Sequence, residues 1–109
     1  MTDKIVVLST CATSEEAARL ARKLVEERLA ACVNVASGVR SFYRWQGAVE
    51  DSPECLLIIK TARDLFDRLR VELEKAHAYE IPEALAIPVL DGAPNYLRWM
   101  DENLRAEPE

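Results

Sequence analysis

The segment from His77 to Glu83 carries the densest group of chemically active side chains in the sequence. It holds the only histidine, together with a tyrosine, a proline and two glutamates. An imidazole, a phenol and carboxylates this close together can bind a divalent metal ion or take part in acid–base chemistry. The simpler interpretation is a helix exit, because His77 is favourable at the negative end of a helix and Pro82 directs the outgoing chain. Residue types alone favour the helix exit and leave the site open.

The three cysteines are the other residues that could take part in a site. Cys11 follows the first apolar run and can approach the segment that begins at His77. A thiolate, an imidazole and a carboxylate together suit a soft or borderline divalent metal ion. Cys32 and Cys55 fall within apolar strand patterns, where packing in the core is the usual role. No Cys-x-x-Cys or His-x-x-x-His spacing occurs, so spacing alone gives weak support to a metal site.

Cys11, His77 and Glu83 can also be drawn as a nucleophile, a base and an orienting acid, although no sequence motif supports that set. The glycines are isolated, and residues 9–13 lack the glycine and arginine of an anion-binding loop. The apolar runs of the expected sheet are aliphatic, whereas RNA-binding sheets stack bases on aromatic side chains. We therefore predict a protein that is not an enzyme and that needs no organic cofactor.

The composition is that of one globular domain spanning residues 1–109, with 50% hydrophobic and 30% charged residues. A net charge of −5 and a pI near 5.0 argue against binding to nucleic-acid phosphates or to an anionic membrane surface. No apolar run reaches the roughly 18 residues that cross a bilayer, and no signal-peptide core is present. An odd number of cysteines does not suggest a disulfide framework. We expect a cytoplasmic protein with no nucleic-acid partner and no membrane insertion.

Apolar patterning predicts the elements that position these side chains. Ile5–Leu8 is a short apolar run, as expected of a strand buried on both faces. Thr13 and Glu16 form a capping box, with Thr13 as N-cap and Glu16 reaching back. Apolar residues at helical spacing behind the box predict an amphipathic helix over residues 14–30. A second amphipathic helix is predicted from residue 61 or 62 to residue 76.

Two long strands are predicted by period-two patterning over residues 32–45 and again over residues 49–61, joined by a Gln-Gly turn. Gly38 is the expected site of a β-bulge. Both strands exceed the usual length of about five to six residues, so the tip of the hairpin must project from so small a domain. We interpret Tyr43 and Trp45 on this hairpin as residues of a subunit interface rather than as ligand contacts.

A short strand over residues 85–90, placed at an edge by Pro88, and a last helix over residues 95–104 complete the pattern. The element order is that of a ferredoxin-like βαββαβ fold of the α+β class with an added C-terminal helix. Right-handed crossovers put both main helices on one face of a four-stranded antiparallel sheet. The other face needs a cover, which together with the long hairpin predicts a homo-oligomer. The residues expected on the inward face of the last helix are Tyr96, Leu97, Met100 and Leu104.

Several of these segments together resemble the CutA family, the divalent-cation tolerance proteins. The likeness covers nearly the whole chain in the right order. The matching segments are Arg28-Leu29-Ala30-Ala31-Cys32-Val33-Asn34, Ser41-x-Tyr43-x-Trp45-x-Gly47-x-x-Glu50, Ile59-Lys60-Thr61, His77-x-Tyr79-x-x-Pro82-Glu83 and Tyr96-Leu97-x-Trp99.

The resemblance implies a ferredoxin-like subunit in a tight homotrimer, similar in build to the PII signalling proteins. It also implies a role in tolerance of copper and other divalent cations. Two positions depart from the family pattern: Ala78 stands where a proline is common, and Ser9 stands where some members carry a metal-linked cysteine. Cys11, two residues after Ser9, is then the thiol nearest to that position. The metal ligands carried over from the resemblance are His77, Glu83 and Cys32.

Three hypotheses of function follow. The first is a cytosolic homotrimer, assembled through the hairpin, that binds copper or another divalent cation in a tolerance or regulatory role without catalysis. Its site would lie in grooves between the hairpin and the His77 loop. The second is a PII-like sensor whose inter-subunit cleft binds a small ligand or a protein partner. The third is a structural trimer that scaffolds a partner. The metal ligands of the first hypothesis are His77, Glu83, Cys32 and Cys11.

Overall fold

The computed structural model describes residues 1–105, and residues 106–109 of the expected domain lie outside the described residues. The predicted order of strands and helices is confirmed, together with the α+β, ferredoxin-like class. The elements are β1 (Lys4–Cys11), α1 (Ser14–Glu26), β2 (Cys32–Trp45), β3 (Ala48–Ala62), the short 3₁₀ helix η1 (Arg63–Leu65), α2 (Phe66–Ala76), β4 (Leu85–Pro88) and α3 (Pro94–Asn103).

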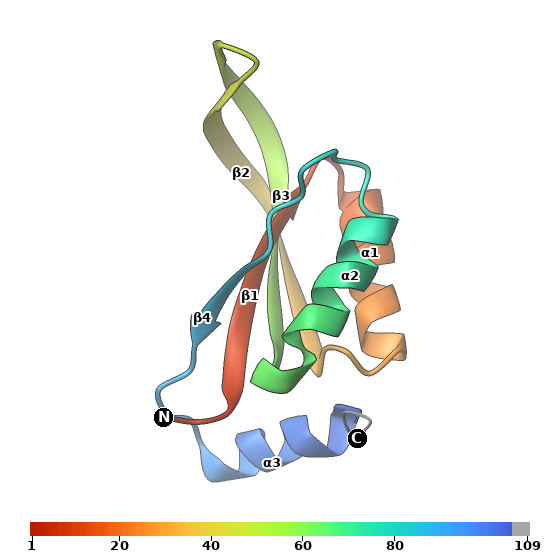
Figure 1. Cartoon of the computed structure of the whole chain (residues 1–109), viewed down its shortest axis with the longest axis vertical. Helices are drawn as coiled ribbons and strands as arrows, with labels where there is room; N and C mark the ends of the chain where they lie inside the picture. The colour runs from red at the N-terminus through yellow and green to blue at the C-terminus, as the bar shows by residue number, and fades with distance from the viewer. Residues whose placement is uncertain (106–109) are drawn as a thin grey trace.

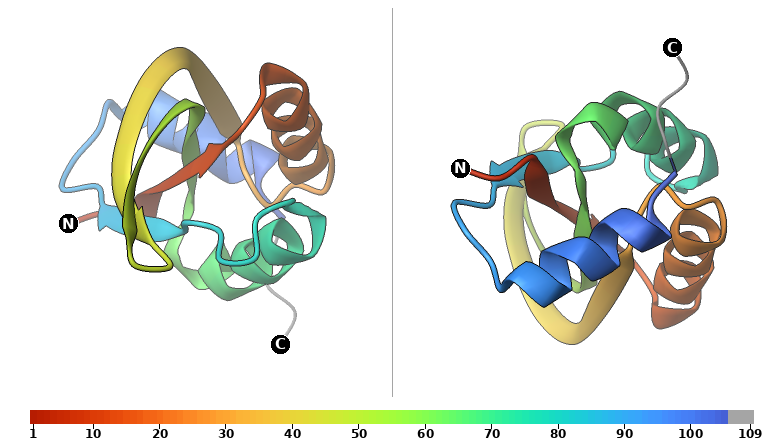
Figure 2. Two further views of the ribbon diagram at one scale, coloured as in Figure 1. Left: turned by 90° about the horizontal axis from the view of Figure 1, so that it is seen from above. Right: turned by 90° about the horizontal axis from the view of Figure 1, so that it is seen from below.

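The four strands form one antiparallel sheet in the order β2-β3-β1-β4. Helices α1 and α2 lie side by side on one face of this sheet, and α3 runs across one end of it (Figures 1 and 2). Most of the other side has no described helix over it, and we call this side the open face. Helix α3 covers only one end of it, where Asp101 pairs with Lys4 and Tyr96 contacts Cys32. The strand pairing and the alternation of side chains assign to the open face Val6, Leu8, Thr10, Cys32, Asn34, Leu56, Ile58, Lys60, Leu85 and Ile87.

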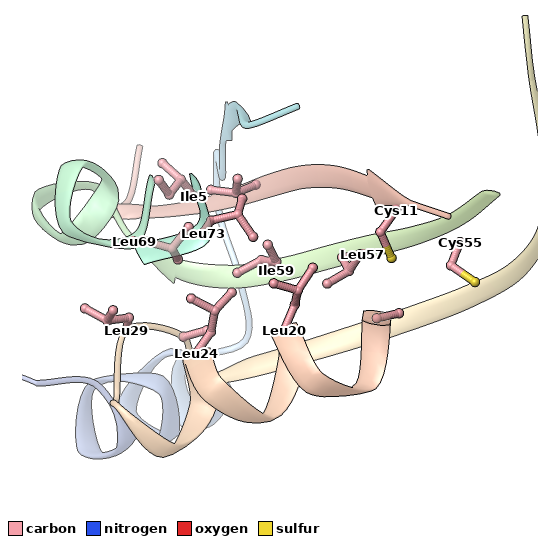
Figure 3. Close-up of a cluster of buried hydrophobic side chains, with 13 residues drawn as sticks. Ile5, Cys11, Leu20, Leu24, Leu29, Cys55, Leu57, Ile59, Leu69 and Leu73 are labelled. Carbon is pink, nitrogen blue, oxygen red and sulfur yellow. The ribbon is translucent and has the colours of Figure 1, made fainter. Parts of the chain in front are cut away.

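The core lies between the sheet and the two main helices (Figure 3). Alternate residues of β1 and β3 point into it, and Ile59 near the C-terminal end of β3 is fully buried. Helix α1 contributes Leu20 and Leu24, and α2 contributes Leu69 and Leu73, each at helical spacing. The periodicities seen in the sequence are therefore those of the buried faces.

The hairpin of β2 and β3 extends well beyond the rest of the sheet, as predicted (Figure 1). Strand β1 pairs with β3 only from Cys55 onward, so the part nearer the turn has no third strand. Its tip has positive φ at Gln46 (51°) and at Gly47 (82°), the backbone of the tight turns that suit hairpins. The predicted bulge is confirmed at Gly38, where φ is 76° and the register between the two strands shifts.

Two predicted helix boundaries are wrong. Helix α1 ends at Glu26 rather than at residue 30, because Arg28 adopts a φ of 60° and the N–H groups of Leu29 and Ala30 both turn back to one carbonyl, that of Leu24. Helix α2 begins at Phe66 rather than near residue 61, because β3 continues pairing with β1 as far as Ala62. Sheet pairing here overrides the helical pattern.

Of the C-terminal elements, β4 is shorter than predicted, and α3 begins and ends one residue earlier than predicted. Strand β4 ends at Pro88, opposite Ile5, and lies at the edge of the sheet as expected for a strand with proline. Of the four residues expected on the inward face of α3, only Met100 is buried, and Tyr96 is 44% exposed. Within residues 1–105, no helix is both long and apolar enough to cross a membrane.

Candidate functional site

The loop between α2 and β4 starts at His77, and this imidazole ties the loop to β1. Its Nε2 lies 2.8 Å from the carbonyl oxygen of Thr10, and its Nδ1 accepts the backbone N–H of Tyr79 at 3.0 Å. Because Nδ1 is an acceptor in this arrangement, the ring proton is on Nε2 and is donated to Thr10. The side chain is fully buried, so both ring nitrogens are used inside the protein.

Glu16 provides a second tie to the loop. The N-cap predicted at Thr13 is confirmed, since its Oγ1 accepts the N–H of Glu16 at 3.1 Å. The Glu16 carboxylate does not reach back in a capping box, however. Its Oε2 accepts the N–H of Ala78 at 2.9 Å and lies 3.6 Å from Nδ1 of His77. The residue that departs from the family pattern, Ala78, therefore supplies an N–H that a proline would lack.

A third tie joins Tyr79 to Glu54 on β3. The phenol donates to Oε2 of Glu54 at 2.5 Å, and Glu54 is only 7% exposed. Burial, followed by this hydrogen bond, raises the pKa of Tyr79 well above its ordinary value of 10. The phenol is therefore a permanent donor at neutral pH. Glu16 was predicted from the sequence only as a capping-box residue, and Glu54 was not singled out at all. The only signal for Glu54 is a charged residue directly before the apolar run of β3.

A cavity of about 680 Å³ opens between this loop and the hairpin, where the sequence placed the candidate site. Glu83 and Glu54 both line it. Burial, and then the negative charge of Glu54, raise the pKa of Glu83 above its usual 4.5. The cavity is lined by Thr10, Ser41, Phe42, Tyr43, Trp45, Glu54, Ala78, Tyr79, Glu80, Ile81 and Glu83.

Cys11 lies in the core below the loop, and not in the cavity. It is fully buried opposite Cys55 on the neighbouring strand, as Figure 3 shows, and its Sγ donates to the carbonyl oxygen of Thr13 at 3.4 Å. Burial, with the charges of Glu16 and Cys55 as smaller causes, raises the pKa of the Cys11 thiol to about 11. At neutral pH this cysteine is a protonated thiol, the form that neither attacks substrates nor binds metal ions.

Cys32 lies far from the loop within one subunit. It pairs with Lys60 on β3, whereas His77 contacts Thr10, which pairs with Leu56. Four residues of strand separate these two levels of the sheet, which is roughly 13 Å. The Cys32 Sγ is 3.8 Å from Oδ1 of Asn34 on the open face.

The four predicted metal ligands do not meet within a single subunit. Among residues 1–105, no group of three or more His, Cys, Asp or Glu side chains is arranged to hold a metal ion. Of the four, Glu83 is the one whose side chain lines the cavity. The structure brings Glu83 together with Glu54, and it places His77 behind them as a support of the loop.

Comparisons of the sequence and of the structure with known proteins all lead to one family. Residues 5–103 match the family described as CutA1 divalent ion tolerance protein. The chain is 46% identical to the divalent-cation tolerance protein CutA of Thermus thermophilus, over 90% of this chain and 95% of that protein. It is 41% identical to the chloroplastic protein CutA of Arabidopsis thaliana over 93% of this chain, which spans 56% of the longer plant protein. The crystal structure of CutA from Xylella fastidiosa superposes with a TM-score of 0.93 at 39% identity, over 95% of this chain and all of that one.

Proposed function

Because the chain belongs to the CutA1 divalent ion tolerance family, we propose that it is a homotrimeric protein that binds divalent cations, copper among them, without catalysing a reaction. The observation that carries the proposal is the pair of carboxylates in the cavity. Glu54 and Glu83 line one partly buried space, and none of the described side chains that line it is a lysine, an arginine or a histidine. Two carboxylates without a counter-ion attract a cation and provide the oxygen ligands that divalent ions accept.

The proposed site rests on Glu83 as ligand, with Glu54 as a second oxygen donor. His77, also predicted as a ligand, would have to give up its contact with Thr10 or with Tyr79 to bind a metal through the imidazole. We assign it to positioning the loop. Cys32 lies on the open face, where a neighbouring subunit would complete any site that used it. The buried thiol of Cys11 is the least available of the predicted ligands.

The trimer part of the proposal is supported by the open face and by the hairpin. Leu85 and Ile87 on β4 are 61% and 47% exposed in the single subunit, although they are large apolar side chains. Tyr43 and Trp45 on the hairpin are 42% and 37% exposed. A closed ring of identical subunits would cover such surfaces on every copy.

Isothermal titration with Cu²⁺ tests the metal site. We expect Glu83→Gln to weaken binding about tenfold, since it removes one charged ligand of a coupled pair. Glu50→Gln is the matched control, because Glu50 lies on the same hairpin but outside the cavity. His77→Ala and Cys32→Ser test whether these two predicted ligands also contribute to Cu²⁺ binding. Equal Cu²⁺ affinity in wild type and Glu83→Gln would show that the proposed metal site is wrong.

A PII-like sensor of small ligands is the second candidate function, and the observation that favours it is the volume of the cavity. About 680 Å³ lies within the range of small-molecule sites. Thermal-shift measurements with metal ions against small metabolites would separate the two functions, and a purely structural trimer would be stabilised by neither. The cytoplasmic location remains a prediction, because the plant relative is named as a chloroplastic protein.

A further inference from the structure

The cavity beside Glu83 has aromatic walls in addition to its carboxylates. Val39 pairs with Glu54, and alternation along β2 then puts Tyr43 and Trp45 on the same face of the hairpin as Glu54. Tyr79 closes the opposite wall from the loop. Aromatic faces attract cations, and they attract organic cations most effectively because these shed their water readily.

The charge of the cavity is negative and uncompensated. Its three charged side chains are Glu54, Glu80 and Glu83, and no basic side chain of residues 1–105 lines it. The two arginines of β2, Arg40 and Arg44, lie on the other face of the hairpin, and Arg40 forms an ion pair of 2.7 Å with Asp51. The cavity therefore has no internal partner for its charge.

Glu54 shows that this charge is directed into the cavity. Its side chain is more than nine-tenths buried and lines the space. One carboxylate oxygen, Oε2, is held by Tyr79, whereas no described residue donates a hydrogen bond to Oε1. This oxygen is open to the cavity, where it can accept a hydrogen bond from a ligand.

The same donor set also fits an ammonium group, which needs fewer ligands from one subunit than a metal ion does. Hard divalent ions take six or more oxygen ligands, and residues 1–105 provide no group of three His, Cys, Asp or Glu ligands here. An ammonium group needs only hydrogen-bond acceptors, and an alkyl stem gains from burial against rings.

We propose that the cavity binds a primary alkylammonium ion, with the ammonium group between Glu54 and Glu83 and the alkyl stem against the sides of Tyr43 and Trp45 that line the cavity. In the proposed trimer a neighbouring subunit would cover only the outer sides of these two rings. This amine site goes beyond the proposed tolerance function, although it uses the same two carboxylates. The class of ligand is a free amine or diamine. A metal ion and such an amine would compete for Glu83.

Titration calorimetry on the metal-free, full-length protein tests the proposal, with butane-1,4-diamine as the probe and butane-1,4-diol as its uncharged counterpart. We expect the diamine to bind and the diol not to bind. Glu83→Gln should weaken the diamine about tenfold, and Trp45→Leu about fivefold. Glu50→Gln and Trp99→Leu, which alter a carboxylate and an indole outside the cavity, should bind as the wild type does.

Absence of diamine binding, or equal binding of the diol, would overturn the proposal, and so would equal diamine affinity in Glu83→Gln and wild type. Glu54→Gln provides a second variant that keeps the acceptor for Tyr79 while removing the charge. A separate titration of the same protein with Cu²⁺ keeps the two proposals apart. Copper binding without diamine binding rejects the amine site alone, and diamine binding without copper binding rejects the metal site alone.

Discussion

Glu16 is the residue through which helix α1 controls the loop. Its carboxylate accepts the N–H of Ala78, so the first peptide after His77 is held against the N-terminal turn of α1. A relative with proline at this position has no N–H to donate. The alanine at 78 is therefore matched to the glutamate at 16 in this chain.

Replacing Glu16 with alanine should release the start of the loop. The hydrogen bond is made to a charged acceptor at a buried residue, and its loss should speed hydrogen exchange of the Ala78 amide by about tenfold or more. Exchange measured by NMR reports this amide directly. Glu15→Ala, one position earlier and exposed, is the control. Unchanged exchange at Ala78 in the Glu16 variant would mean that the carboxylate does not hold the loop in solution.

Glu83 makes stability depend on pH. Since burial and Glu54 raise its pKa above 4.5, the folded protein holds this proton more tightly than the unfolded chain does. Stability conferred by the protonated form is complete below the unfolded pKa and is lost as the pH rises through the raised pKa. We expect Glu83→Gln to melt at a higher temperature than wild type near pH 7 and at the same temperature near pH 3.5. Calorimetry at both pH values would contradict this if the difference appeared at the acidic pH instead.

Among the elements, the hairpin depends on its turn. Gly47 has a φ of 82°, where an added Cβ meets no neighbouring atom but the backbone itself is strained for any L-residue. Gly47→Ala should cost about 1 kcal/mol of unfolding free energy. Gln46→Asn, at a φ of 51°, should instead stabilise by a few tenths, because asparagine tolerates this region. Urea unfolding measures both, and an unchanged midpoint in Gly47→Ala would show that the turn adopts another conformation.

The hairpin also shows what patterning can predict. Its strands, bulge and turn follow from alternation and from two glycines, because these signals are local. The end of α1 was misplaced because Arg28 enters the left-handed region without being a glycine. The start of α2 was misplaced because pairing of Lys4 with Ala62, a long-range contact, decides where β3 stops.

The candidate site was predictable as a place but not as a set of contacts. His77, Tyr79 and Glu83 are close in sequence, so their grouping is visible without a structure. Glu16 and Glu54 reach the same loop only through the fold, from α1 and from β3. The role of Glu16 was hidden by a local pattern, the capping box, that explains the same residue equally well.

At the scale of the whole molecule, the open face should decide assembly. Ile58 lies at its centre, and a charge there would be buried at any contact between subunits. We expect light scattering to give about three times 12.3 kDa for the wild type and a mass near 12.3 kDa for Ile58→Glu. Val71→Glu, on an exposed part of α2, should leave the mass unchanged. A wild-type mass near that of one chain would reject the trimer.

The three cysteines differ in what covers them. Cys11 and Cys55 are enclosed by the core of their own subunit, whereas Cys32 lies on the open face and is partly exposed. A thiol-reactive dye added to the native protein therefore finds at most one cysteine per chain. Whether it finds that one depends on whether the open face is free. Cys32 is thus a built-in label whose reactivity reports how many subunits have come apart.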